Sequence, residues 1–162
     1  MRRRFTLSTL AAAALLAATT AASAQSPSQS SADAEAAIRL QSERFSQAYV
    51  NEDFDTLIGI YAADGMGAPS GRDFIRGREA LRAYWTLPEG VDVTHHRATP
   101  ERLVVDGRHA YDWGRYEGAS GPVGAPRPFG GKYLITWVLD DDGVWRIAND
   151  MWNSVAPPSP AR

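Results

Sequence analysis

The feature that most constrains this chain is a run of four strand-like segments between residues 91 and 153. Turn sequences rich in Gly, Asp or Pro separate the segments at residues 105–108, 118–131 and 140–143. Segments joined in this way are expected to pair with their neighbours in sequence, as an antiparallel meander. Such a sheet needs a second layer to cover one of its faces.

Helical patterns before the strands can supply that layer. Residues 33–50 repeat apolar side chains at helical spacing. A second, short helix is expected to begin after a cap at Asp53 and to end at Gly65. After one short extended piece, a third helix is expected over residues 77–85. The order predicts an α+β fold in which three N-terminal helices pack on one face of an antiparallel sheet.

The first 24 residues have the three parts of an export signal. Basic residues 2–4 precede the apolar run 10–22, and small residues then allow cleavage between Ala24 and Gln25. A membrane anchor is the alternative, but the run is short and interrupted by Thr and Ser. The ordinary secretory route and the twin-arginine route both remain open. Either route predicts a periplasmic or secreted protein without a membrane attachment after cleavage.

The chain that remains after cleavage is acidic and free of cysteine. Removing 24 residues from 162 leaves 138, and it lowers Lys plus Arg from 17 to 14 against 19 Asp plus Glu. A net charge of about −5 argues against a nucleic-acid partner, which needs a basic surface. Without disulfides the hydrophobic core alone must hold the fold. We expect one domain over residues 33–155, between a flexible leader, 25–32, and a loose tail, 156–162.

Several segments carry a family resemblance: residues 51–53, 61–64, 77–81 and 143–153, with the motifs Gly114-Arg-Tyr116, Gly131-Lys-Tyr133 and Trp145-Arg-Ile147. In these segments the chain resembles the SnoaL-like branch of the nuclear transport factor 2-like superfamily, over about residues 35–155. The resemblance implies a cystatin-like cone, in which a strongly curved sheet wraps around the first helix and leaves a pocket at the open end. Members include isomerases, epoxide hydrolases, cyclases and proteins without chemistry, so the fold alone does not decide the function.

Ketosteroid isomerase, a member of that superfamily, uses a carboxylate base together with a tyrosine and a protonated aspartate. Matched without gaps from residues 51–53, its tyrosine position falls on Phe45 and its base position falls near Pro69. Matched back from Gly143, the protonated acid falls on Ile135. The resemblance therefore implies a similar container without the same isomerisation.

Strand alternation, combined with this resemblance, predicts which side chains face the pocket. A turn centred on residues 141–142 gives paired residue numbers that sum to about 283, which places Tyr133 opposite Asp150. Tyr116 is expected near Tyr133, Arg97 on the neighbouring strand, and Asp112 deeper in the cone. The inward set is Ala110, Asp112, Gly114 and Tyr116; Gly131, Tyr133, Ile135 and Trp137; and Ala148, Asp150 and Trp152.

The acids and rings of this set suggest chemistry. Asp150 and Asp112 are candidate catalytic carboxylates, because aromatic surroundings would raise their pKa values toward the range of proton transfer. Tyr116 and Tyr133 are candidate hydrogen-bond donors to a carbonyl or epoxide oxygen. The ligand-binding candidates are Tyr61, Trp85, Arg97, Trp137 and Trp152. Alternatively, the aspartates satisfy backbone amides or an arginine, and the rings are plain core.

Other residues give weaker signals. His95 and His96 are adjacent on a strand and point to opposite faces, and with His109 they lack the spacing of a metal site, so they are expected at the surface or the pocket rim. Ser120 lacks the strand-to-helix context of a nucleophile. Residues 121–131 are expected to form a hairpin loop over the pocket mouth. The sequence therefore predicts neither a metal nor a cofactor.

The sequence thus predicts an exported domain whose pocket binds a small, partly apolar organic molecule. Acid–base chemistry, such as isomerisation, hydration or epoxide opening, is the expected activity. The alternative is a non-catalytic, dimeric ligand-binding or assembly domain. It rests on an outward strand set that is apolar enough to pack against a second copy and form a homodimer, namely Trp113, Leu134, Thr136, Val138 and Trp145.

Overall fold

The computed structural model of the protein describes residues 30–155. The expected export signal, its cleavage site, most of the leader and the tail lie outside the described residues. No helix within this range has the length and apolar character that crossing a membrane requires.

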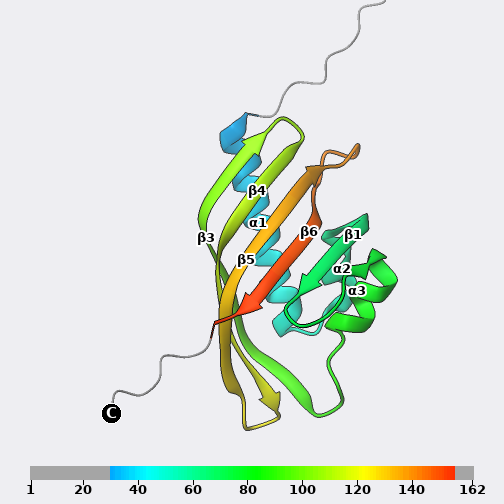
Figure 1. The fold of residues 1–162 in the computed structure, drawn as a ribbon, viewed down its shortest axis with the longest axis vertical. Helices are drawn as coiled ribbons and strands as arrows, with labels where there is room; N and C mark the ends of the chain where they lie inside the picture. The colour runs from blue at the N-terminus through cyan, green and yellow to red at the C-terminus, as the bar shows by residue number, and fades with distance from the viewer. Residues whose placement is uncertain (1–29, 156–162) are drawn as a thin grey trace, which may run out of the picture.

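Within residues 30–155, nine elements form two layers, a curved open sheet with helices against one face (Figure 1). The strand order is β2-β1-β6-β5-β4-β3, in which β3 to β6 form the expected antiparallel meander. The element bounds are α1 Ser31–Val50, α2 Phe54–Gly59, β1 Tyr61–Pro69, β2 Ile75–Arg76, α3 Gly77–Trp85, β3 Val91–Asp106, β4 His109–Pro122, β5 Arg127–Leu139 and β6 Trp145–Ser154. This arrangement confirms the predicted α+β fold.

The long helix α1 runs behind the sheet and packs mainly on β3 (Figure 1). It begins at Ser31, two residues before the expected start, because Oγ of Ser30 accepts a hydrogen bond of 3.1 Å from the backbone N–H of Asp33. Its inner side buries Ala34, Ile38, Phe45 and Ala48. This row of apolar side chains forms one wall of the space between helix and sheet.

The second helix is shorter than predicted. Asp53 caps it as expected, with Oδ1 accepting from the N–H of Thr56 at 3.0 Å, but the helix ends at Gly59 rather than Gly65. The backbone then enters β1, which lies parallel to β6, and the N–H of Ile147 donates to the carbonyl of Ile60 at 2.9 Å. Pairing with a strand far along the chain overrides the local helical pattern here. The sheet is therefore mixed rather than purely antiparallel.

The turns predicted at residues 105–108 and 140–143 are confirmed. The turn predicted over residues 118–131, with its loop at 121–131, is wrong in length, because residues 118–122 belong to β4 and residues 127–131 belong to β5. The β3–β4 connection contains Gly107 at φ +60° and the β5–β6 connection contains Gly143 at φ +77°. Both lie in the left-handed region that glycine adopts without strain. The β4–β5 hairpin folds back between Pro122 and Arg127.

A β-bulge in β6 changes which side chains face inward. Trp137 pairs with Ile147 whereas Thr136 pairs with Asn149, so Ala148 is an extra residue without a partner on β5. Trp145 and Ile147 therefore face the same side as Asp150. The expectation that Trp145 faces outward is wrong, because it is only 2% exposed and belongs to the core. The expectation that Ala148 belongs to the inward row is wrong for the same reason.

The register of β5 and β6 also differs from the prediction. Tyr133 pairs with Trp152, and Asp150 pairs with Ile135, so the predicted pairing of Tyr133 with Asp150 is two residues out. The turn shifts the register by one residue and the bulge by one more. On β4 the register agrees with the expected depth of Asp112, which pairs with Ile135.

Candidate functional site

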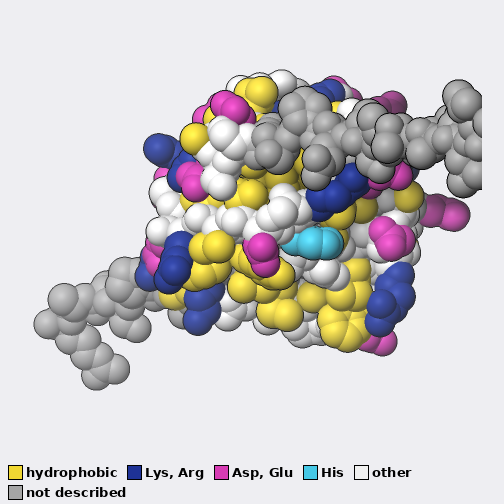
Figure 2. Space-filling model, turned by 90° about the horizontal axis from the view of Figure 1, so that it is seen from above, with side chains coloured by type: hydrophobic (Ala, Val, Ile, Leu, Met, Phe, Trp, Pro, Cys, Tyr) yellow, Lys and Arg dark blue, Asp and Glu magenta, His cyan; other side chains and the backbone are white. Residues whose placement is uncertain are grey.

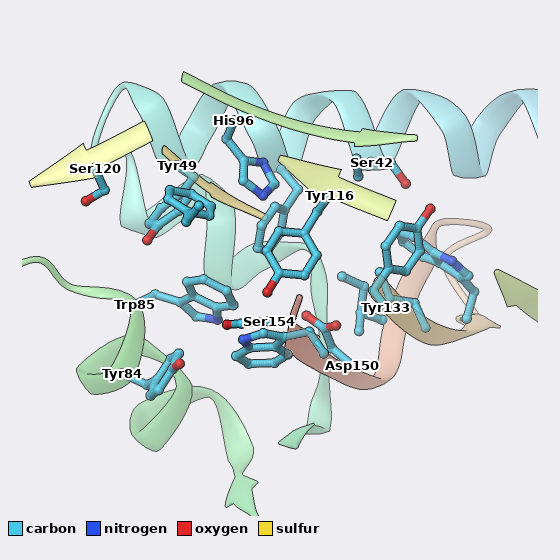
Figure 3. A pocket seen from close by; sticks show the side chains of 17 residues that line it. Ser42, Tyr49, Tyr84, Trp85, His96, Tyr116, Ser120, Tyr133, Asp150 and Ser154 are labelled. Carbon is cyan, nitrogen blue, oxygen red and sulfur yellow. The ribbon is translucent and has the colours of Figure 1, made fainter. Parts of the chain in front are cut away.

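A pocket opens between α1, α3 and the inner face of the sheet (Figure 3). Its volume of about 340 Å³ lies within the range of small-molecule sites. Ten of the side chains that line it are aromatic: Phe45, Tyr49, Tyr84, Trp85, His96, Tyr116, Phe129, Tyr133, Trp137 and Trp152. An enclosure made largely of rings favours a ligand with substantial apolar surface.

Asp150 is the one carboxylate in the pocket lining of the described chain. The side chain projects from β6 and is 6% exposed, and its Oδ2 accepts a hydrogen bond of 2.8 Å from Oη of Tyr61. Burial raises the pKa of Asp150 to about 7; the hydrogen bond from Tyr61 opposes this rise, and the nearby Asp112 adds to it by a smaller amount. A carboxyl group with such a pKa exchanges protons at neutral pH.

Tyr61 lies behind Asp150 rather than in the pocket wall where the sequence placed it. Its side chain is fully buried, and its hydroxyl also accepts a hydrogen bond of 3.2 Å from Nε1 of Trp85. Burial, together with the carboxylate of Asp150, raises the pKa of Tyr61 well above its usual value. The phenol thus stays protonated and works as a fixed donor that orients Asp150. Trp85 itself lines the pocket, as expected.

Asp112 lies deeper than Asp150, as expected. It is 1% exposed, and Oη of Tyr133 donates to its Oδ1 at 3.1 Å. Its Oδ2 and Nε1 of Trp137 have no hydrogen-bond partner among the described residues, although the Trp137 indole is close enough to lower the pKa of Asp112. Burial is the larger effect and raises that pKa to about 6. Asp112 therefore does not reach the pocket surface, whereas the ring of Tyr133 does.

The expectation for Arg97 is wrong. Val93 pairs with Ser120 and His95 pairs with Ala119, so Thr94 is an extra residue that reverses the alternation along β3. Arg97 is exposed on the outer face, and His96 takes the inward position.

His96 lines the pocket, whereas the sequence predicts it at the surface or the pocket rim. Its Nδ1 lies 2.9 Å from Oγ of Ser46 on α1, within hydrogen-bonding distance. Burial lowers the pKa of His96 to about 4, so the imidazole is neutral at pH 7. The signal that could have placed it was the histidine pair itself, since one member of such a pair must face inward.

Tyr116 projects into the pocket, and its hydroxyl points toward the region of Asp150 (Figure 3). Within residues 30–155 this hydroxyl has no hydrogen-bond partner, which leaves it free for a ligand. Gly131 lies opposite on β5, and a Cβ atom there would approach the Tyr116 oxygen to 2.8 Å. The absence of a side chain at Gly131 therefore leaves room for the Tyr116 hydroxyl and for the carbonyl oxygen of Asn153.

Trp85 and Trp152 form one wall. Their rings stack with centroids 5.2 Å apart at an angle of 27°, and Tyr84 packs edge-on against both. Trp137 lines the pocket as expected, whereas Phe45, Tyr49 and Tyr84 were not predicted to do so. Phe45 and Tyr49 belong to the apolar repeat at helical spacing over residues 33–50, and such a pattern does not separate a core contact from a pocket wall.

No Lys or Arg side chain of the described residues lines this pocket. The guanidinium of Arg72 lies over the Tyr84 ring, 5.6 Å from its centroid, without contributing to the lining. Among residues 30–155 no group of three or more His, Cys, Asp or Glu side chains is placed to hold a metal. On the face seen in Figure 2, basic and acidic side chains are interspersed with hydrophobic ones.

Comparisons with known proteins agree with this geometry. A family model described as a SnoaL-like domain matches residues 42–149. A search of curated proteins finds no match.

Three solved structures illustrate the likeness in fold. A ketosteroid isomerase-like protein from Erwinia carotovora atroseptica is 20% identical, covers 75% of this chain and 96% of its own, and has a TM-score of 0.66. A conserved protein from Planctomyces limnophilus is 24% identical with the same coverage and a TM-score of 0.68. A nuclear transport factor 2-like protein with a cystatin-like fold, from Novosphingobium aromaticivorans, is 20% identical, covers 79% of this chain and 86% of its own, and scores 0.62. The predicted family and cystatin-like fold are confirmed.

Proposed function

The chain belongs to the SnoaL-like domain family, and on that premise we propose that it binds a small, partly apolar organic molecule and transfers a proton to or from it through Asp150. Proteins of this family are often ligand-binding or isomerase-like. Neither the fold nor the family selects among these activities, so the proposal rests on the pocket itself.

The observation that carries the proposal is the position of Asp150. One carboxylate oxygen is held by Tyr61 at 2.8 Å, and the other accepts no hydrogen bond from the described residues, which leaves it for a ligand. The pKa of about 7 supplies both the acid and the base form at neutral pH. A buried carboxyl group tuned in this way is typical of a proton-transfer residue.

Tyr116 and His96 complete the proposed chemistry. In its base form Asp150 takes a proton from a ligand carbon, or from a water that then adds to the ligand. In its acid form it returns that proton to a second carbon or to an oxygen. The Tyr116 hydroxyl donates a hydrogen bond to the oxygen on which negative charge develops. The neutral His96 ring adds a polar edge without adding charge.

A panel of enones, epoxides and lactones tests the proposal. Asp150→Asn keeps the size of the side chain and the Tyr61 contact but removes the proton exchange, so turnover is expected to fall by at least about a hundredfold. Asp142→Asn, in the exposed β5–β6 turn, is the matched control and should retain full activity. Absence of turnover with the whole panel, or full activity in the Asp150→Asn variant, would count against the proposal.

A non-catalytic assembly domain is the second candidate, favoured by the outer face of the sheet. Leu134 and Met151, on adjacent strands there, are 43% and 52% exposed. Trp113 lies beside them on β4 with the Arg102 guanidinium 5.5 Å from its ring. If this face joins two copies, sedimentation should give a dimer that Trp113→Arg dissociates, while Leu40→Arg, at an exposed position of α1 on the other side of the sheet, leaves it intact. A strict monomer would reject this candidate.

We also propose that the domain works outside the cytoplasm, from the basic and apolar pattern of its first 24 residues. Mass spectrometry of the protein recovered from a bacterial periplasm or medium should show a chain that begins at Gln25. Recovery of an uncleaved chain from the cytoplasm would contradict the proposal.

A further inference from the structure

Two buried carboxylates of the described residues, Asp112 and Asp150, form no ion pair and accept no hydrogen bond from a cationic side chain. In the described chain the only hydrogen-bond donor to Asp150 is Tyr61, and the only donor to Asp112 is Tyr133, and both are neutral phenols. All the ion pairs of the described residues lie elsewhere, and none includes either aspartate. Burying a carboxylate without a counter-charge is costly, so this site lacks a positive charge.

The walls around the free oxygen of Asp150 are suited to hold a cation. Trp85 and Trp152 stack into one aromatic surface, and Tyr116 adds a further ring (Figure 3). The faces of such rings carry partial negative charge and attract cations. No Lys or Arg of residues 30–155 occupies this space, and His96 is neutral.

We propose that the ligand of this pocket is an organic cation, a molecule whose ammonium group faces Asp150 and packs against the aromatic walls. The inference rests on the proposed function, since it names the charge of the ligand at that same site. An anionic ligand would meet a carboxylate with no compensating cation in the lining. A neutral ligand would leave the carboxylate unpaired or require it to be protonated. With a cation bound, Asp150 stays ionised and serves as the base.

The groups that face Asp150 determine how binding depends on pH. They come from each packed element: Tyr61 on β1, Tyr84 on α3, His96 on β3, Asp112 and Tyr116 on β4, and Tyr133 on β5. Two cations act on these groups: Arg39 on α1 lowers the pKa of Asp112, and Arg72 lies over the ring of Tyr84. Between about pH 6 and 8 the tyrosines with raised pKa values stay protonated and His96 stays neutral. The carboxyls Asp150 and Asp112, with pKa values of about 7 and about 6, therefore govern the change in this window.

Two probes of the same shape separate charge from hydrophobicity. They are para-(hydroxymethyl)phenyl-trimethylammonium and para-tert-butylbenzyl alcohol, which differ in one atom, N⁺ against C. Calorimetric titration of the intact domain at about pH 8 should give the cation at least about tenfold higher affinity. At about pH 6 the affinity for the cation should fall about tenfold, because most of Asp150 is then protonated, while the affinity for the alcohol changes little.

The variants make the test specific. Asp150→Asn should abolish the preference for the cation and leave alcohol binding within about twofold, whereas Glu117→Gln, on the exposed outer face of β4, should keep the preference. Equal or tighter binding of the alcohol to the unaltered protein would overturn the inference while leaving the proposed pocket function standing. Binding of neither probe would overturn the inference and also count against the proposed function.

Discussion

Replacing Asp150 with asparagine should stabilise the protein, and the gain should grow with pH. The folded state holds the Asp150 pKa near 7 against an ordinary value of 3.8, so the folded state binds more protons than the unfolded state between these values. The stability associated with the protonated carboxyl is complete below pH 3.8 and is lost as pH rises through 7. At 1.36 kcal/mol for each pKa unit, the protein loses about 4 kcal/mol of this stability above pH 8 and about 2 kcal/mol of it at pH 5, relative to low pH.

Urea denaturation at about pH 5 and about pH 8.5 measures the difference. The advantage of Asp150→Asn over the unaltered protein should increase by about 2 to 3 kcal/mol between the two pH values. Asp142→Asn is the control and should destabilise the protein. Arg146 holds the pKa of Asp142 at about 2, so the ion pair that this substitution removes is present to the same extent at both pH values. A gain for the Asp150→Asn variant that is constant or shrinks with pH would refute the reasoning.

Three further predictions concern the supporting residues. Tyr61→Phe removes the hydrogen bond to the carboxylate and should raise the Asp150 pKa by about one unit, measured by carbon NMR of labelled aspartate; an unchanged pKa would contradict it. His96 should remain neutral at about pH 5.5. The stability that its neutral form contributes is complete above pH 6.5 and should be lost as pH falls through about 4. Nitrogen NMR that finds a protonated ring at pH 5.5 would be the contrary result. Gly131→Ala forces a Cβ atom onto the carbonyl oxygen of Asn153 and should cost about 1 to 3 kcal/mol; an unaltered urea midpoint would speak against that contact.

The regular part of the sheet could be predicted because its signals are local. Turn residues such as Gly107 and Gly143 mark where strands end, and alternation along β4 and β5 runs without interruption from Ala110 to Tyr116 and from Gly131 to Trp137. The side chains on the inner face of these two strands can therefore be predicted, because every second residue of a regular strand faces the same side.

The errors in predicting which side chains face inward occur where β-bulges interrupt the alternation of side chains. Extra residues at Thr94 and Ala148 reverse the alternation, which turned Arg97 outward and Trp145 inward. The position of a bulge depends on how two strands pair with each other, so it cannot be predicted from the sequence of one strand alone.

The first half of strand β1, which the sequence predicts as helix, has a related cause. Residues 61–65 continue a helical pattern, yet Tyr61 pairs with Ile147. Ile147 lies far along the chain, so the local pattern carries no information about this pairing. The same pairing brings the Tyr61 hydroxyl to Asp150. The geometry of the candidate site therefore depends on a strand pairing that the local sequence does not predict.

Ala148 divides β6 into two parts of opposite phase. The part before it, with Trp145 and Ile147, closes the core, and the part after it, with Asp150 and Trp152, furnishes the pocket. If that one residue were deleted, either the core tryptophan or the pocket acid would have to turn to water. The number of residues in β6, as much as their identity, therefore determines whether the Asp150 carboxyl group faces the pocket.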